Sequence, residues 1–208
     1  METEKISPDL SGSETLNSIY TRRAVRKYRN KPVDHEIIQQ LIDAGRMAPS
    51  AINKQPWRFY ILTNKETIDL ISKEISKALA KNMIRSGPVK ILRTLKDIMH
   101  FHTGGGLFKS EDPIFHGAPV VIFITAPKEN EWAAMDIGMC AQNIMLAAKS
   151  LGLNTCPVGL AKFIEQTKSY PLLGVPSSDQ VLLAVILGYG DEEPEVHKRL
   201  KNNAVFIE

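Results

Sequence analysis

Apolar side chains recur every three or four residues in four stretches of the chain, which is the spacing of an amphipathic α-helix. The expected helices span residues 14–23, 35–48, 65–84 and 131–150. The second is the best bounded, because Asp34 suits a helix N-cap and Pro49 pushes the residue before it out of helical geometry. Pro49 therefore marks the start of a loop.

Continuous apolar runs rich in β-branched residues alternate with these helices and are typical of buried strands. The expected strands are WRFYILT (57–63), APVVIFITA (118–126) and QVLLAVILGYG (180–190), with NTCPVGL (154–160) as a short strand or turn. A short helix, AKFIEQTKSY, precedes the last strand, and the chain ends in the apolar AVFIE. Interleaved strands and helices without a linker predict one domain, residues 1–208, folded as an α/β or α+β sandwich around one main sheet.

The composition is that of an ordinary globular protein. Of 208 residues, 43% are hydrophobic and 24% charged, and the net charge of +3 is smaller than nucleic-acid-binding proteins usually carry. No apolar run is long enough for a transmembrane helix, and residues 1–13, which we expect to be flexible, contain no signal-peptide core. Cys140 and Cys156 suit a reducing compartment better than a disulfide framework. We therefore expect a cytoplasmic protein that does not enter a membrane.

Six of the 26 Lys and Arg side chains fall within TRRAVRKYRNK, residues 21–31, which has no acidic residue. Three interpretations of this cluster compete: a solvated basic surface, a nucleic-acid patch, and a site for the phosphate of a cofactor or substrate. Arginines spaced one and four apart on a helix would converge on one phosphate. The chain lacks both G-x-x-x-x-G-K-[ST] and a G-x-G-x-x-G between a strand and a helix, so a Rossmann dinucleotide site is not expected.

A polar loop, APSAINKQPWRF, joins the second expected helix to the first strand and carries hydrogen-bonding side chains at Ser50, Asn53 and Gln55. Such a loop is usually only a turn. Paired with an arginine cluster, however, its hydroxyl and amide groups could bind the edges of a planar heterocycle.

RRAVRKY, an amphipathic helix and APSAINKQPWRF follow one another in an order that resembles the FMN-dependent nitroreductase family. Two later segments, DIGMCAQNIMLAAKSLGL with CPVG after it, and LLAVILGYGDEEPEVHKR, fit the same order, so the resemblance covers residues 15–207. It implies an α+β sandwich in which helices flank a central, mainly antiparallel sheet. It also implies a homodimer in which the tail, residues 200–208, crosses to the partner subunit and adds a strand to its sheet.

The resemblance implies a set of residues that bind FMN. They are Arg22, Arg23, Ala24, Arg26, Pro49, Ser50, Ala51, Asn53, Gln55, Pro157, Val158, Gly159, Leu160, Lys198 and Arg199. Two positions depart from the family, because many relatives have a serine hydroxyl where this chain has Ala24, and often a second one at Ala51. His197 could replace either basic residue of the C-terminal pair, Lys198 and Arg199.

Each part of this set has an implied role. Arg22 and Arg23 would bind the phosphate and ribityl chain, and Arg26 would lie near the N1–C2=O edge, where negative charge develops when the ring is reduced. Ser50 and Asn53 would reach the flavin from the partner subunit. Residues 157–160 would pass along the ring, with a backbone N–H facing N5, and the C-terminal pair would return to the phosphate.

The implied activity is that of an FMN-dependent oxidoreductase. NADH or NADPH would deliver a hydride to flavin N5, and a small conjugated acceptor such as a nitroaromatic or a quinone would take it. Because the cofactor carries this chemistry, we expect no catalytic side chain. Reductive dehalogenation and flavin fragmentation occur in relatives with the same motifs and stay open. From a different class, a non-catalytic module that binds nucleic acid or another anion is the alternative, although it leaves the polar loop unexplained.

His100, His102 and His116 surround a glycine-rich segment near Asp112 and invite a metal interpretation. An H-x-H pattern alone is a weak signal, and the chain has no H-E-x-x-H motif, so we expect no metal site. We interpret this segment as a loop on the substrate side.

Overall fold

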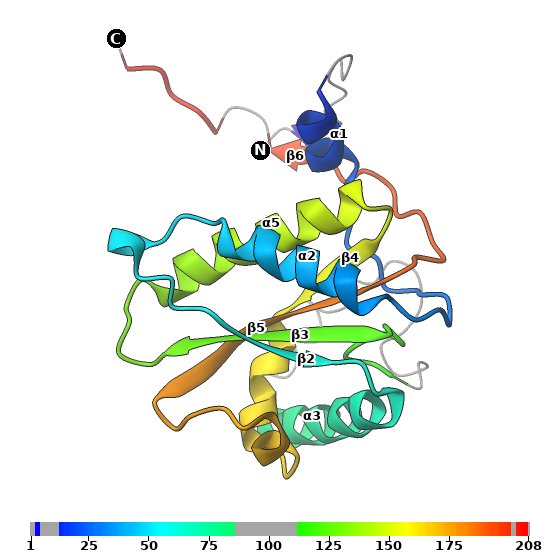
Figure 1. Ribbon diagram of the computed structural model, residues 1–208, viewed down its shortest axis with the longest axis vertical. Helices are drawn as coiled ribbons and strands as arrows, with labels where there is room; N and C mark the ends of the chain where they lie inside the picture. Colours follow the sequence, from blue (N-terminus) through cyan, green and yellow to red (C-terminus); the bar gives the residue numbers. More distant parts are fainter. Residues whose placement is uncertain (1–2, 5–12, 86–111, 201–202, 208) are drawn as a thin grey trace.

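The computed structural model describes residues 3–4, 13–85, 112–200 and 203–207. Its centre is a four-stranded sheet with the strand order β2-β3-β5-β4, in which all neighbours are antiparallel (Figure 1). The strands are β2 (Arg58–Leu62), β3 (Val120–Pro127), β4 (Asn154–Val158) and β5 (Asp179–Gly188). The expected mainly antiparallel sheet is thus confirmed, and its two edges are β2 and β4.

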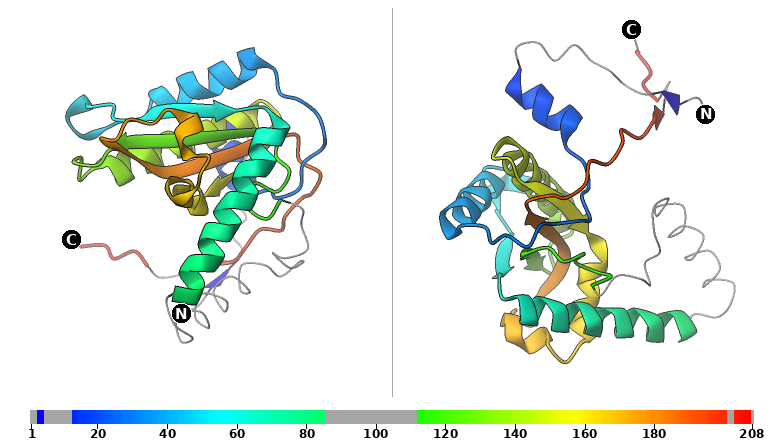
Figure 2. Two further views of the ribbon diagram at one scale, coloured as in Figure 1. Left: turned by 90° about the horizontal axis from the view of Figure 1, so that it is seen from below. Right: turned by 90° about the vertical axis from the view of Figure 1, so that its right-hand side faces the viewer.

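Helices cover both faces of this sheet (Figures 1 and 2). On one face lie α2 (His35–Arg46) and α5 (Ala133–Ser150); on the other lie α3 (Lys65–Arg85) and the 3-10 helix η2 (Gly159–Gln166). The short 3-10 segments η1 (Ala51–Asn53) and η3 (Tyr170–Leu173) follow α2 and η2. The helix α1 (Glu14–Thr21) stands at the edge of the body beside α5. Apart from the main sheet, β1 (Thr3–Glu4) and β6 (Arg199–Leu200) form a separate two-stranded ribbon.

The alternation of side chains along β3 divides the core into two parts. Val120, Ile122 and Ile124 pack toward α2 and α5, whereas Val121 and Phe123 pack toward α3 and η2. Every residue of β3 except the last is buried, because helices cover this strand on both faces. The unbroken apolar run in the sequence is therefore a central strand.

One local expectation needs correction. The first helix ends at Thr21, not at residue 23, because the chain beyond it is extended and pairs with β4. Asp34 is the N-cap of α2 as expected, although its side chain makes no capping bond. The short helix expected over residues 161–170 is the 3-10 helix η2, which ends earlier, at Gln166.

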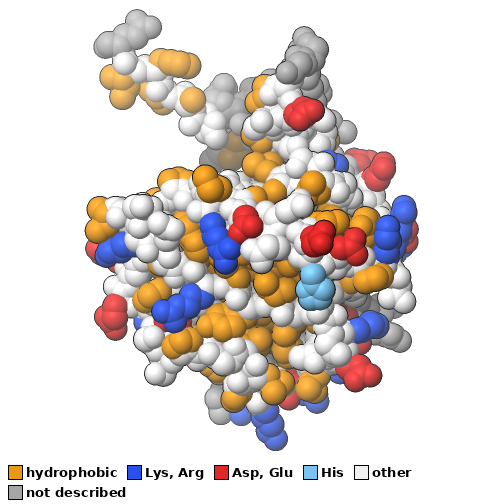
Figure 3. Space-filling model, viewed as in Figure 1, with side chains coloured by type: hydrophobic (Ala, Val, Ile, Leu, Met, Phe, Trp, Pro, Cys, Tyr) orange, Lys and Arg blue, Asp and Glu red, His pale blue; other side chains and the backbone are white. Residues whose placement is uncertain are grey.

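The apolar C-terminal tail leaves the body instead of packing on it (Figure 1). Val205, Phe206 and Ile207 are 85%, 91% and 94% exposed, and these side chains stand clear of the surface in the space-filling view (Figure 3). At the sheet edge, β2 pairs only with β3 within the described residues. No helix in the described ranges is both long and apolar enough to cross a membrane.

Candidate functional site

The arginine segment runs along the edge of the sheet in extended conformation. After α1, Ala24 forms a parallel bridge to Thr155 of β4, and the Val25 N–H donates to the Thr155 carbonyl at 3.0 Å. Val25 itself is 1% exposed, which fixes the segment against the core. The arginines therefore do not converge through helical spacing as expected. In an extended chain alternate residues share a side, so Arg22 and Arg26 lie on the same side of the strand.

The guanidinium of Arg22 is half-buried and lacks partners. Its Nε and Nη1 atoms are fully shielded from solvent, and neither has a hydrogen-bond partner in the described part of the chain. Burial lowers the pKa of Arg22, Cys156 partly offsets this, and the positive charge of Arg199 lowers it further. Buried donors without acceptors are costly, so the arrangement fits an anion that supplies oxygen atoms.

Arg23 has a different environment from Arg22. Its Nη1 donates to the carbonyls of Tyr20 at 2.7 Å and Arg22 at 2.6 Å, and so binds the free carbonyls at the C-terminus of α1. Burial lowers the pKa of Arg23, and the charges of Arg199 and Arg22 lower it further. Of the two C-terminal basic residues, Arg199 is the one whose charge acts on the pKa of both Arg22 and Arg23. Its Nη1 donates to the backbone carbonyl of Lys198 at 3.5 Å.

Cys156 marks the place where the arginine segment meets β4. Burial raises the pKa of its thiol, Arg26 and Arg22 lower it, and Glu192 raises it. These three charged groups therefore lie around one thiol. Glu192 also accepts the backbone N–H of Arg26. The next residues, Pro157 to Leu160, are exposed except Val158, which is 7% exposed. The end of β4 and the arginine segment thus form one half of a site.

The remaining cations of the cluster bind residues after β5. Arg29 pairs with Asp191 at 3.6 Å, and the Lys31 ammonium lies 3.9 Å from the centroid of the Tyr189 ring. The Asp191 N–H donates to the Lys27 carbonyl at 2.8 Å. Arg29 and Lys31 therefore have partners on the protein itself, whereas Nε and Nη1 of Arg22 have none among the described residues.

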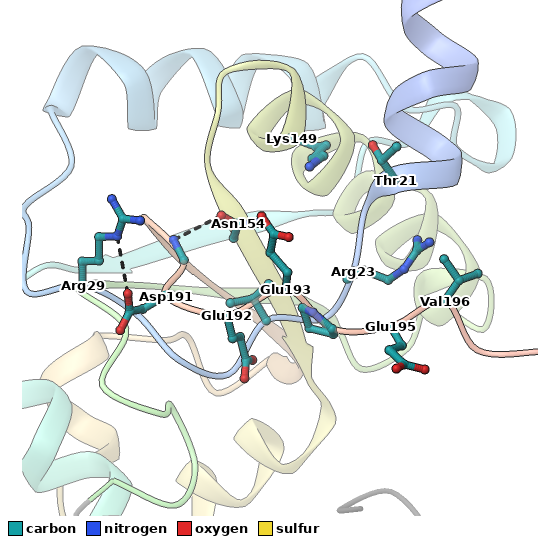
Figure 4. Close-up of a pocket in the computed structure, with 13 residues that line it drawn as sticks. Thr21, Arg23, Arg29, Lys149, Asn154, Asp191, Glu192, Glu193, Glu195 and Val196 are labelled. Carbon is teal, nitrogen blue, oxygen red and sulfur yellow. Dashed lines mark hydrogen bonds and ion pairs between the residues drawn. The ribbon is translucent and has the colours of Figure 1, made fainter. Parts of the chain in front are cut away.

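A cavity of about 780 Å³ opens between α1, the end of α5 and residues 190–196 (Figure 4). Arg23, Arg29 and Lys149 line it, together with four carboxylates. Those carboxylates belong to Asp191, Glu192, Glu193 and Glu195. Four carboxylates against three cations would repel a phosphate, so we do not assign the expected cofactor to this cavity.

The loop after α2 lies at the opposite end of the sheet from the arginine segment (Figures 1 and 2). Its side chains bond mainly to the loop itself. The Gln55 N–H donates to Ser50 Oγ at 2.9 Å, and Gln55 Nε2 donates to Asn53 Oδ1 at 3.1 Å. One subunit therefore does not bring Ser50 and Asn53 to Arg22, and the two halves of the expected site meet only if a second subunit supplies the loop.

Asp136 is a residue of the site region that the sequence did not lead us to expect. It is 1% exposed in the first turn of α5, and its Oδ1 accepts the Ala51 N–H of the loop at 3.2 Å. The sequence does mark it, because Asp136 precedes Ile137 and is a charged residue on the inward face of the helix, which is otherwise apolar.

The metal interpretation finds no support in the described residues. No three His, Cys, Asp or Glu side chains come together there as a metal would require. His100 and His102 lie outside the described residues.

Comparison with known proteins gives consistent matches over most of the chain. The model of the nitroreductase family matches residues 19–189. A 4-nitrobenzoate reductase of Pseudomonas putida is 28% identical, over 86% of this chain and 86% of the relative. An NADH dehydrogenase of Thermus thermophilus is 26% identical, over 89% and 91%. The crystal structure of a nitroreductase with bound FMN from Desulfitobacterium hafniense has a TM-score of 0.77 at 26% identity, covering 94% of this chain and 99% of that one.

Proposed function

Because the chain belongs to the nitroreductase family, and is thus an oxidoreductase, we propose that it binds FMN and reduces small conjugated acceptors with NADH or NADPH. The whole chain, residues 1–208, would form one FMN-binding domain. A nitroaromatic acceptor is supported by the Pseudomonas putida relative, and the donor by the Thermus thermophilus relative. The free thiols of Cys140 and Cys156 favour the cytoplasm as its location.

The observation that carries this proposal is the unpartnered guanidinium of Arg22. The N–H groups of its two shielded nitrogens are donors that find no acceptor within the described chain. Arg199 adds positive charge to the surroundings of Arg22. The terminal phosphate of FMN would supply both the oxygens and the negative charge. Nη1 of Arg23 and Nη1 of Arg199 already donate to backbone carbonyls, so both side chains would contribute mainly charge beside the phosphate.

When bound, FMN supplies the redox chemistry, by taking a hydride from the nicotinamide at N5 and passing it to the acceptor. The protein binds and orients this group. Arg26 places a cation near Cys156, and the backbone beside Arg26 is held by Glu192. A cation at this position would stabilise negative charge on the neighbouring pyrimidine edge. The exposed residues Pro157, Gly159 and Leu160 would offer backbone groups along the ring.

The site is complete only in a homodimer. The loop after α2 lies at the opposite end of the sheet from the segment after α1 (Figure 1), so Ser50, Asn53 and Gln55 of this loop would serve the flavin of the partner subunit. The tail gives a second argument for a dimer, because an exposed apolar segment and an open sheet edge are both aggregation hazards unless they are paired. Residues 203–207 would add a strand to the free edge of the partner's β2, where Ile61 is 42% exposed.

Purification of the full chain tests the proposed function directly. We expect yellow protein with flavin absorbance, which NADH or NADPH bleaches without oxygen and a nitroaromatic or quinone restores. A panel that includes halogenated aromatics would distinguish reductive dehalogenation. Colourless protein that FMN does not reconstitute would show that the proposal is wrong.

A further inference from the structure

The buried carboxylate of Asp136 makes an unusual contact for a helix residue. Its Oδ1 accepts the N–H of Ala51, 85 positions earlier in the chain, at 3.2 Å. Its Oδ2 is fully shielded and has no partner within the described residues. A buried carboxylate with one oxygen unsatisfied costs stability, so packing alone does not account for it.

The loop that Asp136 holds has a strained backbone. Ile52, Asn53 and Gln55 have φ values of 47°, 56° and 46°, in the left-handed region that side chains with a Cβ seldom adopt. For Ile52, which is β-branched, the conformation is especially unfavourable, and this side chain is 86% exposed. Packing therefore does not stabilise this conformation. Strained backbone persists only where the surroundings determine it, and it concentrates at binding sites.

The hydrogen bonds of the loop show what determines its shape. Among the described residues, the hydrogen bonds of positions 50–55 run within the loop. One of them joins the Asn53 N–H to the Ser50 carbonyl at 3.0 Å. The exception is the bond from Ala51 to Asp136. This carboxylate is therefore the polar anchor between the strained loop and the rest of the fold.

We propose that Asp136 is a positioning residue, whose carboxylate holds the loop in the shape that presents Ser50 and Asn53 to the flavin of the partner subunit. The inference rests on the proposed function, because it assumes that the loop contacts FMN. Asp136 itself touches neither the cofactor nor a substrate. Its effect on the flavin passes through the Ala51 N–H and the backbone of the next residues.

Two substitutions and a control separate positioning from simple stability. Asp136→Ala removes the anchor, whereas Asp136→Asn keeps an acceptor oxygen of the same shape. Ile144→Val, on the same helix, shortens a fully buried side chain that faces Gly45 of α2 and takes no part in the Ala51 contact. We expect the FMN dissociation constant to rise about tenfold or more in Asp136→Ala, with Asp136→Asn in between and Ile144→Val unchanged. An FMN dissociation constant in both Asp136 variants equal to that of Ile144→Val would overturn the proposal.

Hydrogen exchange of the flavin-free protein tests the anchor without relying on the proposed function. The amides of residues 51–55 should exchange faster in Asp136→Ala than in wild type, while the rest of α5 keeps its protection. Unchanged exchange in the loop would contradict the anchor even if wild type binds FMN. If wild type instead fails to bind FMN, the proposed function is wrong, and the exchange result stands by itself.

A mixed dimer tests whether Asp136 acts across the interface. One subunit carries Arg22→Ala and the other Asp136→Ala, each with a different affinity tag. If the loop serves the partner's flavin, both defects fall on one site and the other site is wild type. The mixed dimer should then bind one FMN tightly, although neither variant homodimer does. Absence of a tight site in the mixed dimer would show that Asp136 does not act in this way.

Discussion

Arg22 is the residue in which the need for a ligand is easiest to see. Its shielded Nε and Nη1 have no acceptor among the residues that the structure describes, and the charge of Arg199 adds repulsion. Both effects raise the free energy of the ligand-free chain. A bound dianion would remove both costs, because its oxygens would accept from the shielded nitrogens and its charge would attract both arginines.

Replacement of Arg22 by Ala should therefore weaken FMN binding far more than it weakens the fold. Loss of a charge-assisted partner of the phosphate corresponds to about 1.5–3 kcal/mol, or a roughly ten- to hundred-fold rise in the dissociation constant. Flavin fluorescence titration measures the constant, and thermal unfolding of the flavin-free protein measures stability. The matched control is Arg46→Ala, whose side chain pairs with Asp43 on the surface. Full flavin occupancy of Arg22→Ala after long dialysis would refute the assignment.

Cys140 gives a prediction about pH. Burial raises the pKa of its thiol to about 12, whereas an unfolded thiol has a pKa of about 8.5. Between these values the folded chain keeps a proton that the unfolded chain loses, so the free energy of unfolding falls as the pH rises through this window. Urea unfolding near neutral pH and at about pH 10 should show a smaller loss in Cys140→Ala than in wild type. Equal losses in the two proteins would mean that Cys140 makes no such contribution.

The arginine cluster and the polar loop stood out in the sequence, but only their resemblance to the nitroreductase family assigned Arg22, Arg26 and Ser50 to FMN. Their contacts with the cofactor stay a prediction. The pairing of Asp136 with Ala51 could not be predicted, because it depends on how two distant elements pack. The same holds for the bond that Glu192 accepts from the Arg26 N–H, which joins segments far apart in the sequence.

At the scale of elements, α2 and α5 pack closely because Gly45 leaves room between them. A Cβ at Gly45 would lie 2.8 Å from Ile144 Cγ1 and 3.2 Å from Cys140 Sγ. Distances this short force neighbouring side chains to move.

Gly45→Ala should lower the free energy of unfolding by about 1–2 kcal/mol, since overpacking outweighs the better helix propensity of Ala. The matched control is Gly138→Ala on α5, where an added Cβ meets nothing within 4 Å. That change should raise the free energy of unfolding by about 0.5–1 kcal/mol. Chemical unfolding of both variants measures the difference. A higher free energy of unfolding for Gly45→Ala than for wild type would show that α2 and α5 can move apart without a loss of stability.

Most elements were predictable because their signals are local. The apolar run of β3 and the spacing of α2 are set within a few residues, and their bounds agree closely with expectation. The end of α1 was not predictable, because the bond from Val25 to Thr155 of β4 draws the arginines into extended chain. Local pattern cannot anticipate a contact between segments more than a hundred residues apart.

At the scale of the whole molecule, the exposed tail and the free edge of β2 predict an obligate dimer. Removal of residues 203–208 should weaken both dimerisation and FMN binding, because in the proposed dimer each subunit would supply part of its partner's sheet. Size-exclusion chromatography with light scattering should give twice 23.2 kDa for wild type and a lower mass for the truncated chain.

A single substitution within the tail separates its apolar contacts from its length. Phe206, 91% exposed in the isolated chain, should be intolerant of Asp but tolerant of Leu if it is buried against the partner. A stable, flavin-loaded species of monomer mass, whether wild type or variant, would rule out the dimer proposal.

In the proposed dimer, the separation of the arginine segment and the loop after α2 to opposite ends of the sheet would couple cofactor supply to assembly. When each flavin needs both subunits, FMN and the second subunit raise each other's affinity by the same factor. Dilution should then release flavin, and excess FMN should reassemble dimers by mass action. The amount of active protein in a cell would follow the product of chain and vitamin supply, and riboflavin starvation would lower it through dissociation before any change in synthesis.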